Sequence, residues 1–214
     1  GYDIEKEFDS ESFAQKLKLF RNSNPKKFNA LFKTSKLTNA FNNLFYNEQI
    51  QGLCSDILGI DAETVVIGEK QLRIDEPKDK LYTLDWHQDS PYYPQAKNGQ
   101  DSIVINICLQ RCVKDMGSVE LIKGSHTKGT FEVKTDNIVS NVEQLKVNKE
   151  ILDTTNIIVL EPEVSDVIIY DMNLIHKSGY NQSNKARVSV IGRAFNPLSD
   201  NFTPYQYTNL ELVN

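Results

Sequence analysis

Residues 102–109 read SIVINICL. Successive side chains of a β-strand point to opposite faces, so the isoleucines share one face, while Val104, Asn106 and Cys108 share the other. A short run rich in β-branched residues and bounded by polar residues is typical of a strand. The stretch therefore predicts a strand with one apolar face and one mixed face.

Similar runs recur along the chain, with turn-rich segments rather than helices between them. They occupy residues 64–73, 119–122, 157–160, 166–170 and 187–195. Several short strands in succession predict an antiparallel sandwich or barrel. Residues 134–155 are polar and carry several asparagines, and we expect a long loop or short helix there, with a lid as one interpretation.

The segment that precedes these strands has helical spacing. In residues 5–58, apolar residues such as Phe13, Leu17 and Phe20 recur every three or four positions, and Pro25 divides the pattern. The sequence therefore predicts helices first and strands afterwards, a mainly β protein with N-terminal helices.

The length and the absence of a linker favour one domain. A chain of 214 residues is long enough for one sizeable core and short for two. We expect a single domain over residues 1–214, in which a helical part, about residues 1–60, packs on a β core over residues 61–200.

Composition excludes several classes of partner. The net charge of -5 gives no basic field for nucleic acid. No apolar run is long enough to cross a bilayer, and the first residues lack a basic-then-apolar signal, so no membrane partner is expected. Cys54, Cys108 and Cys112 form an odd set without a Cys-x-x-Cys pair, which indicates buried free thiols in a reducing cytoplasm.

Two of the three histidines stand in contexts that suit a metal. On a strand, His87 and Asp89 of Trp86-His87-Gln88-Asp89 would point to one face. His176 follows the apolar run that ends near residue 170. Two imidazoles and one carboxylate on one face of an octahedron leave three positions open, as non-haem iron(II) needs. Alone, His-x-Asp is a weak signal that a surface histidine beside a capping aspartate also explains.

Downstream of His176, Arg187 opens the next apolar strand. The planar fork of arginine suits a fixed carboxylate, and a surface ion pair explains the residue equally well.

Taken together, three segments resemble the phytanoyl-CoA dioxygenase-like family of iron(II) and 2-oxoglutarate oxygenases. They are residues 86–89, residues 116–126, which read MGSVELIKGSH, and residues 176–187. The resemblance implies a double-stranded β-helix, a cupin-like jelly roll preceded by helices. It also implies that His87, Asp89 and His176 bind iron(II), and that Arg187 and Ser178 hold the far carboxylate of 2-oxoglutarate.

The same resemblance implies an oxygenase that uses 2-oxoglutarate and dioxygen to hydroxylate a small organic substrate, releasing succinate and carbon dioxide. Related halogenases replace the carboxylate ligand with a small residue, so the presence of Asp89 favours hydroxylation. His126 lies outside the implied ligand set, and a turn or packing role is the simpler interpretation.

Four further candidates rest on geometry, three of them on strands and Tyr92 in the loop after Asp89. Asn106 lies on the mixed face of its strand and could bond the cosubstrate. Arg193 shares a face with Arg187, and would favour an anionic substrate if it reached the site. Gln71 and Tyr92 flank the first motif, where binding residues often lie. An exposed polar position explains Asn106 almost as well, and hydrophobic packing explains Tyr92 equally well.

Two other functions remain open at this stage. A cupin-like isomerase or hydrolase could use the same ligands with another divalent ion. A non-catalytic jelly-roll module could bind sugar or peptide in a groove. The sequence identifies neither the substrate nor an oligomeric state.

Overall fold

The N-terminal part forms helices, as predicted, in a computed structural model that describes residues 10–80, 83–136 and 144–203. Side chains cap three of these helices: Ser10, Thr38 and Asn47 each accept a hydrogen bond from a backbone N–H in the first turn. Pro25 occupies the first helical position of its helix. The bounds are α2 Glu11–Ser23, α3 Pro25–Ser35, α4 Asn39–Asn43 and α5 Glu48–Leu58.

The strands begin close to the positions that the β-branched runs predict. All strand pairs in the described residues are antiparallel. The strands are β1 Val66–Asp75, β2 Ser102–Cys108, β3 Val119–Ile122, β4 Val133–Asp136, β5 Gln144–Val147, β6 Ile157–Val159, β7 Val167–Asp171, β8 His176–Ser178 and β9 Arg187–Phe195.

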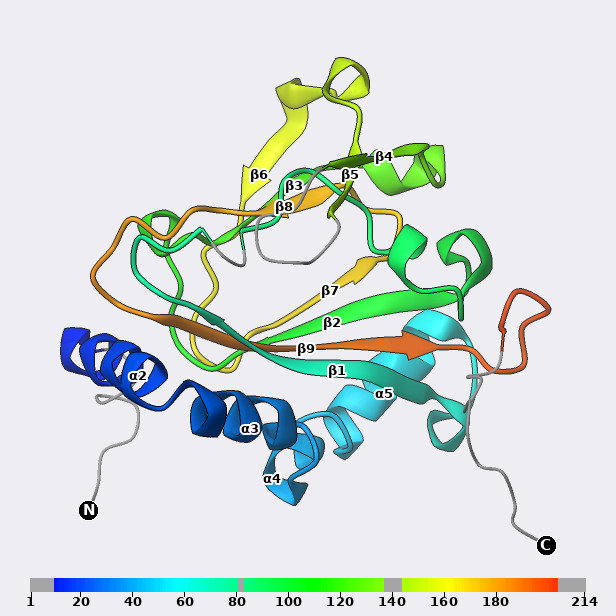
Figure 1. The fold of residues 1–214 in the computed structure, drawn as a ribbon. Coiled ribbons are helices and arrows are strands. Elements are labelled where there is room, and N and C mark those ends of the chain that lie inside the picture. Colours follow the sequence, from blue (N-terminus) through cyan, green and yellow to red (C-terminus); the bar gives the residue numbers. More distant parts are fainter. Residues whose placement is uncertain (1–9, 81–82, 137–143, 204–214) are drawn as a thin grey trace, which may run out of the picture.

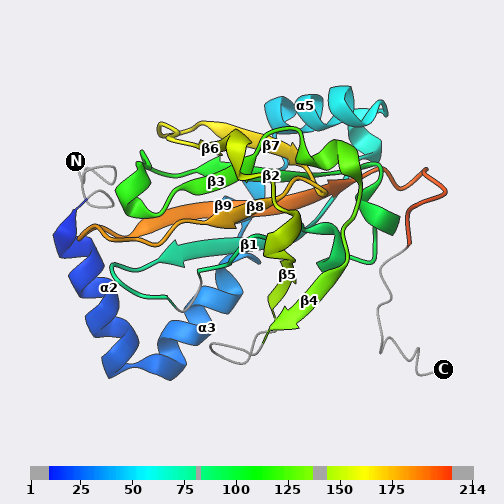
Figure 2. The ribbon, with the colours of Figure 1, turned by 90° about the horizontal axis from the view of Figure 1, so that it is seen from above.

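Two sheets make up the β body. The larger has the order β1-β9-β2-β7, and the smaller has the order β6-β3-β8 (Figure 1). Seen from above, the smaller sheet lies over the larger one (Figure 2). This arrangement is the predicted jelly roll, a double-stranded β-helix. The mixed face of β2, with Asn106 and Cys108, points between the sheets, together with every second residue of β9 from Arg187 to Arg193.

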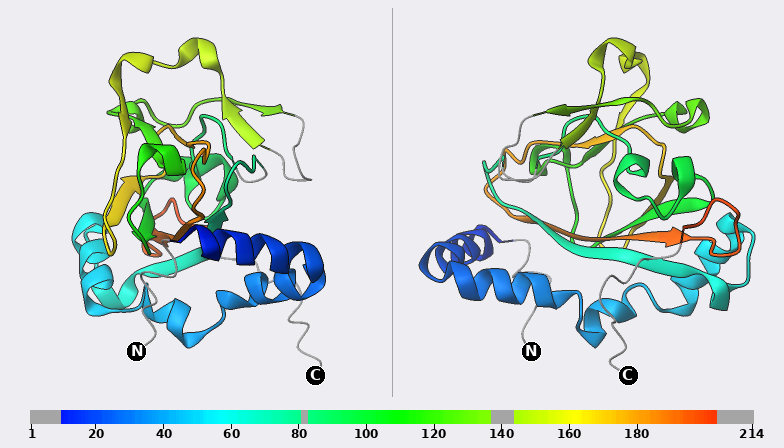
Figure 3. Two further views of the ribbon diagram at one scale, coloured as in Figure 1. Left: turned by 90° about the vertical axis from the view of Figure 1, so that its left-hand side faces the viewer. Right: turned by 45° about the vertical axis from the view of Figure 1, so that its right-hand side comes forward.

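The helices cover the outer face of the larger sheet (Figure 3). One buried cluster joins Phe41, Phe45 and Ile50 of the helical part to the isoleucines of β2, which confirms the apolar face predicted for that strand. Gly192 on β9 permits this packing, because a Cβ atom there would lie 2.7 Å from the Phe45 ring. Helix packing on the sheet leaves the opposite face free for a site.

Residues 134–155 differ from the prediction of a loop or short helix. β4 and β5 pair there as a two-stranded antiparallel sheet, followed by the short 3-10 turns η6 Lys149–Ile151 and η7 Thr154–Asn156. The prediction was wrong because each of these strands spans only four residues, too few for the alternation of Leu145 and Val147 in β5 to distinguish a strand from a loop in the sequence. The lid role stays a prediction, and residues 137–143 lie outside the described residues.

No helix in the described ranges is both long and apolar enough to cross a membrane. The three cysteines are free and buried, as their spacing predicts.

Candidate metal centre

The segment that carries His87 and Asp89 is not a continuous strand, which corrects the expectation from spacing. His87 forms an isolated antiparallel bridge with His176, and Asp89 already has helical φ and ψ angles of -76° and -32°. Pro91 is the physical reason, because it lies in the 3-10 turn η2 Ser90–Tyr92 and favours a turn over a strand. The turn nevertheless keeps both side chains facing one point.

Backbone hydrogen bonds hold the two histidines side by side. The His87 amide donates to the His176 carbonyl at 2.9 Å, and the His176 amide donates back at 3.0 Å. The Asp89 amide donates to the carbonyl of Met172 at 3.0 Å. His176 opens β8, in the smaller sheet. Both histidines are therefore fixed by the pairing of distant segments.

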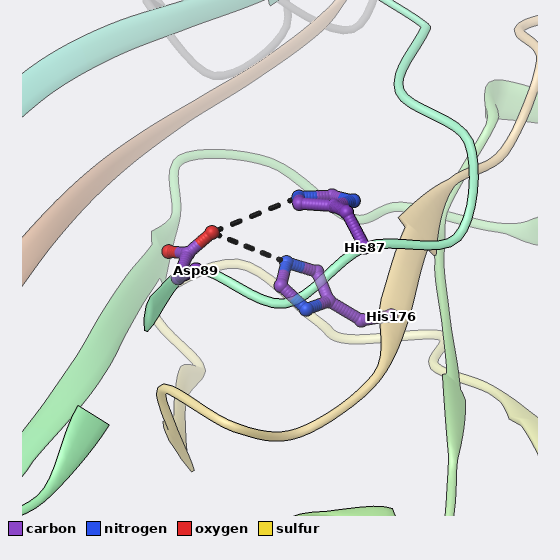
Figure 4. A group of neighbouring side chains, drawn as sticks. All are labelled: His87, Asp89 and His176. Carbon is purple, nitrogen blue, oxygen red and sulfur yellow. Dashed lines mark ion pairs between the residues drawn. The ribbon is translucent and has the colours of Figure 1, made fainter. Parts of the chain in front are cut away.

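The three side chains converge (Figure 4). Nε2 of His87 lies 3.6 Å from Oδ1 of Asp89, and Nε2 of His176 lies 3.8 Å from the same oxygen. The three donor atoms lie within 4.8 Å of one another. All three residues are buried. Among the described residues this group has the donor set and spacing of a metal site.

Both imidazoles are held in the tautomer that a metal requires. Nδ1 of His87 lies 2.7 Å from the carbonyl oxygen of Asp85, and Nδ1 of His176 lies 2.9 Å from that of Leu174. A carbonyl oxygen only accepts, so in each neutral ring Nδ1 carries the hydrogen. The lone pair is therefore on Nε2, the atom that faces Asp89.

The local electrostatics favour neutral histidines and an ionised aspartate. Burial, together with the neighbouring His176, lowers the pKa of His87 to about 3, and burial also lowers the pKa of His176. Burial would raise the pKa of Asp89, but the Arg193 guanidinium outweighs it and the pKa falls to about 2. All three groups are in their metal-binding protonation states at neutral pH.

Arg193 stands behind Asp89. Its Nε and Nη2 donate to Oδ2 at 3.0 and 2.8 Å, and its guanidinium lies 4.4 Å from the centre of the Tyr93 ring. Nη1 donates to the carbonyl of Glu69 at 3.2 Å. Glu69 has a φ of 45° at the irregularity between Gly68 and Gln71 of β1. This bulge supplies the backbone oxygen that helps to fix the guanidinium.

Arg187 is also paired. Its Nε and Nη2 donate to Oδ2 of Asp75 at 3.0 and 2.6 Å, and Asp75 lies opposite Arg187 in the β1–β9 register. Arg73 donates to both oxygens of Asp75, each at 2.9 Å, and to Oγ of Ser178 at 2.7 Å. Burial would raise the pKa of Asp75, but Arg73 and Arg187 lower it to about 2. One buried carboxylate thus holds two guanidinium groups.

A cavity of about 40 Å³ that opens to solvent brings most of the predicted site residues together. Its walls include the three metal-ligand candidates, the cosubstrate candidates Asn106, Ser178 and Arg187, and the substrate candidates Gln71 and Arg193. Tyr92 is not among the wall residues. Its hydroxyl accepts a hydrogen bond from the Leu145 amide at 2.6 Å, and its ring meets that of His87 edge-on. His126 is exposed in the 3-10 turn η5 Ser125–Lys128.

Sequence reasoning missed two groups at this site, one that pairs with two arginines of the cavity wall and one that lies in the wall itself. Asp75 had no signal, because only the strand register shows that it faces Arg187. Tyr170 lines the cavity, with its hydroxyl 3.3 Å from Nε2 of His176. In the sequence it is one residue of an apolar run, and nothing there distinguishes it from the core.

Iron(II) fits the donor set. Two imidazole lone pairs and Oδ1 of Asp89 converge from one side, while Oδ2 is occupied by Arg193, so the carboxylate can offer one oxygen. Oδ1 of Asn106, a residue in the wall of the same cavity, is buried without a hydrogen-bond partner in the described part of the chain. Since a buried polar atom without a partner is costly, this atom fits a polar ligand in the cavity.

The sequence profile of the phytanoyl-CoA dioxygenase (PhyH) family matches residues 6–189. The chain therefore belongs to this oxygenase family, as its motifs predict. No curated protein matches the chain significantly in sequence.

Solved structures share the fold. EvdMO1 is 26% identical, with a TM-score of 0.54 over 74% of this chain and 33% of its own. EvdO2 from Micromonospora carbonacea var. aurantiaca, complexed with 2-oxoglutarate, is 15% identical, with a TM-score of 0.61 over 72% of this chain and 62% of its own. EctD from S. alaskensis with bound Fe is 16% identical, with a TM-score of 0.60 over 76% and 54%. The chain thus spans a third of EvdMO1 and less than two thirds of the other two.

Proposed function

We propose that this chain is an iron(II) and 2-oxoglutarate-dependent dioxygenase that hydroxylates a small organic substrate and releases succinate and carbon dioxide. One observation carries the proposal: a His/Asp/His donor set shares a cavity with Arg187 and Ser178. A cupin-like isomerase or hydrolase would have no use for these two residues beside its metal. A binding module would need neither group, so the oxygenase is favoured over both alternatives.

His87 and His176 would bind the iron through Nε2, and Asp89 through Oδ1. Because Arg193 occupies Oδ2, Asp89 would fill one coordination position and leave three for other ligands. Iron(II), when bound, supplies the chelation of 2-oxoglutarate and the activation of dioxygen.

The cosubstrate would lie between the metal and Arg187. Arg187 has donors that Asp75 does not use, and Asp75 balances only one of its two arginines. One positive charge is therefore left for the far carboxylate of 2-oxoglutarate. Ser178 and Asn106 would add hydrogen bonds, since the Asn106 amide can turn its NH₂ toward an oxygen.

The charge of the cavity favours an anionic substrate. Arg73, Arg187 and Arg193 face two carboxylates, those of Asp75 and Asp89, which leaves one positive charge. Iron(II) adds two positive charges and 2-oxoglutarate two negative ones, so the net charge of the loaded cavity is still one positive unit, even though Arg187 itself is paired with the far carboxylate.

Among the substrate candidates, Gln71 has the clearest access, because it lies on the cavity wall two residues from Arg73. Arg193 is engaged by Asp89, and Tyr92 by the Leu145 amide. We propose that Gln71 and Arg73 face the substrate. Arg193 would instead orient Asp89, and Tyr92 would hold β5 through the Leu145 amide. A reducing, cytoplasmic setting suits iron(II) and the free thiols.

The test is anaerobic titration of metal-free protein with iron(II) and then 2-oxoglutarate, followed by the weak visible charge-transfer band of the chelate. The native protein should give the band, and Arg187→Lys should need at least tenfold more 2-oxoglutarate, because lysine loses the fork. Arg111→Lys, at an exposed arginine paired with Glu163, is the matched control. Iron binding without a band would return the cupin-like alternative to first place.

A further inference from the structure

Tyr170 places a hydroxyl group beside the metal-ligand candidates. It lies on β7, opposite Val104 of β2, and its ring meets the His176 ring at 4.9 Å between centroids. Its oxygen is 3.3 Å from Nε2 of His176, the atom that would bind the metal. None of the roles derived above uses this hydroxyl.

The direction of this hydrogen bond follows from the tautomer of His176. Nδ1 of His176 donates to Leu174, so Nε2 carries a lone pair and can only accept. A tyrosine hydroxyl is protonated at neutral pH and can donate. Tyr170 therefore donates to Nε2, and no other hydrogen bond of this hydroxyl is found within residues 10–80, 83–136 and 144–203.

A metal ion needs the same lone pair. Once Nε2 binds the metal, the Tyr170 hydroxyl loses its acceptor and must find another, since an unsatisfied donor inside a site is unfavourable. A metal–nitrogen bond is about 2.1 Å long, so the hydroxyl, 3.3 Å from Nε2, lies at most about 5.4 Å from the ion. An oxygen bound to the metal on the side of Tyr170 would then be the nearest new acceptor for this hydroxyl.

We infer that the Tyr170 hydroxyl donates a hydrogen bond to a metal-bound oxygen of 2-oxoglutarate when the site is loaded. The inference rests on the proposed function, because a chelating 2-oxoglutarate would fill two of the three open positions with its own oxygens. Tyr170 thus changes acceptor, from Nε2 of His176 to the cosubstrate. It is a cosubstrate-binding residue that the family motifs do not include.

Tyr170→Phe tests this, because it keeps the ring packed against His176 and removes only the hydroxyl. Under anaerobic conditions, iron(II) should bind the variant at least as tightly as the native protein, since the competing donor is gone. The affinity for 2-oxoglutarate should fall about tenfold, the effect of losing one hydrogen bond to a charged acceptor. The charge-transfer band should also shift, because its energy depends on the chelating oxygens.

Tyr46→Phe is the matched control, because that hydroxyl bonds the Ile67 carbonyl at 2.9 Å on the helix-covered side of the sheet. If Tyr170→Phe binds 2-oxoglutarate as tightly as the native protein does and its band is unshifted, the inference is overturned. The proposed function would still stand in that case, provided the native protein gives the band. Absence of the band in the native protein would overturn both.

Discussion

Arg193 donates two hydrogen bonds to a single oxygen of Asp89, Oδ2, at 3.0 and 2.8 Å. The other oxygen, Oδ1, faces the Nε2 atoms of His87 and His176 at 3.6 and 3.8 Å. One carboxylate thus has a structural oxygen and a metal-facing oxygen. The Arg193 guanidinium fixes these two roles, because its two hydrogen bonds to Oδ2 resist rotation of the carboxylate.

Arg193→Lys should weaken metal binding. Lysine keeps the positive charge but lacks the fork, so Asp89 can rotate and its oxygens no longer have fixed roles. Loss of a residue that orients a metal ligand typically lowers metal affinity about 10- to 100-fold. Calorimetric titration of the metal-free variant with iron(II) under anaerobic conditions measures this. Native affinity would show that Arg193 supports only the fold.

Gly192→Ala should destabilise the protein. The added Cβ would lie 2.7 Å from the Phe45 ring, which is completely buried. Overpacking of this kind costs about 1–3 kcal/mol. Gly52→Ala in α5 is the matched control, because a Cβ there meets nothing within 4 Å and alanine favours the helix. In urea unfolding, the free energy of unfolding should therefore fall in Gly192→Ala and rise slightly in Gly52→Ala, relative to the native protein. Equal free energies of unfolding in the two variants would contradict the packing described.

The protein should lose stability in acid. The pKa values of Asp75 and Asp89 are each about 2 in the folded protein and near 4 in the unfolded chain. The unfolded chain therefore takes up protons more readily, so the stability from each carboxyl is complete above pH 4 and disappears as the pH falls through 2. Each contributes roughly 2 kcal/mol at neutral pH.

Urea unfolding of the metal-free protein at several pH values between 2 and 6 measures this loss. In Asp75→Asn, which removes one of the two carboxyls, the unfolding free energy should start lower and decline less between pH 4 and 2. A decline as steep as that of the native protein would show that the Asp75 pairings contribute no acid-sensitive stability.

The fold was predictable because its signals are local. Alternation in β2 and helical spacing in the first helices depend on neighbours in sequence, and both match the structure. The hairpin of β4 and β5 was not predictable, because its residues are mostly polar and its pairing is decided by partners across the strand. Local turn chemistry also outweighed spacing at Asp89, where Pro91 ends the extended backbone.

The candidate site was predictable as a set of residues and not as a network. The motifs identified the histidines and Arg187 because their types and order are distinctive. The partner of Arg187 depends on the register that sets Asp75 opposite it, and the contact of Arg193 with Glu69 depends on a bulge. Neither the strand register nor the bulge can be recognised from a single sequence.

The most direct test of the central claim is anaerobic calorimetric titration of metal-free protein with iron(II), with and without 2-oxoglutarate. His126→Ala, which changes an exposed histidine, is the matched control for His176→Ala. We predict one iron(II) per chain in the native protein and in His126→Ala, bound more tightly when 2-oxoglutarate is present, because the two ligands share a site. His176→Ala should bind at least 100-fold more weakly, and native affinity in that variant would contradict the assignment of the metal centre.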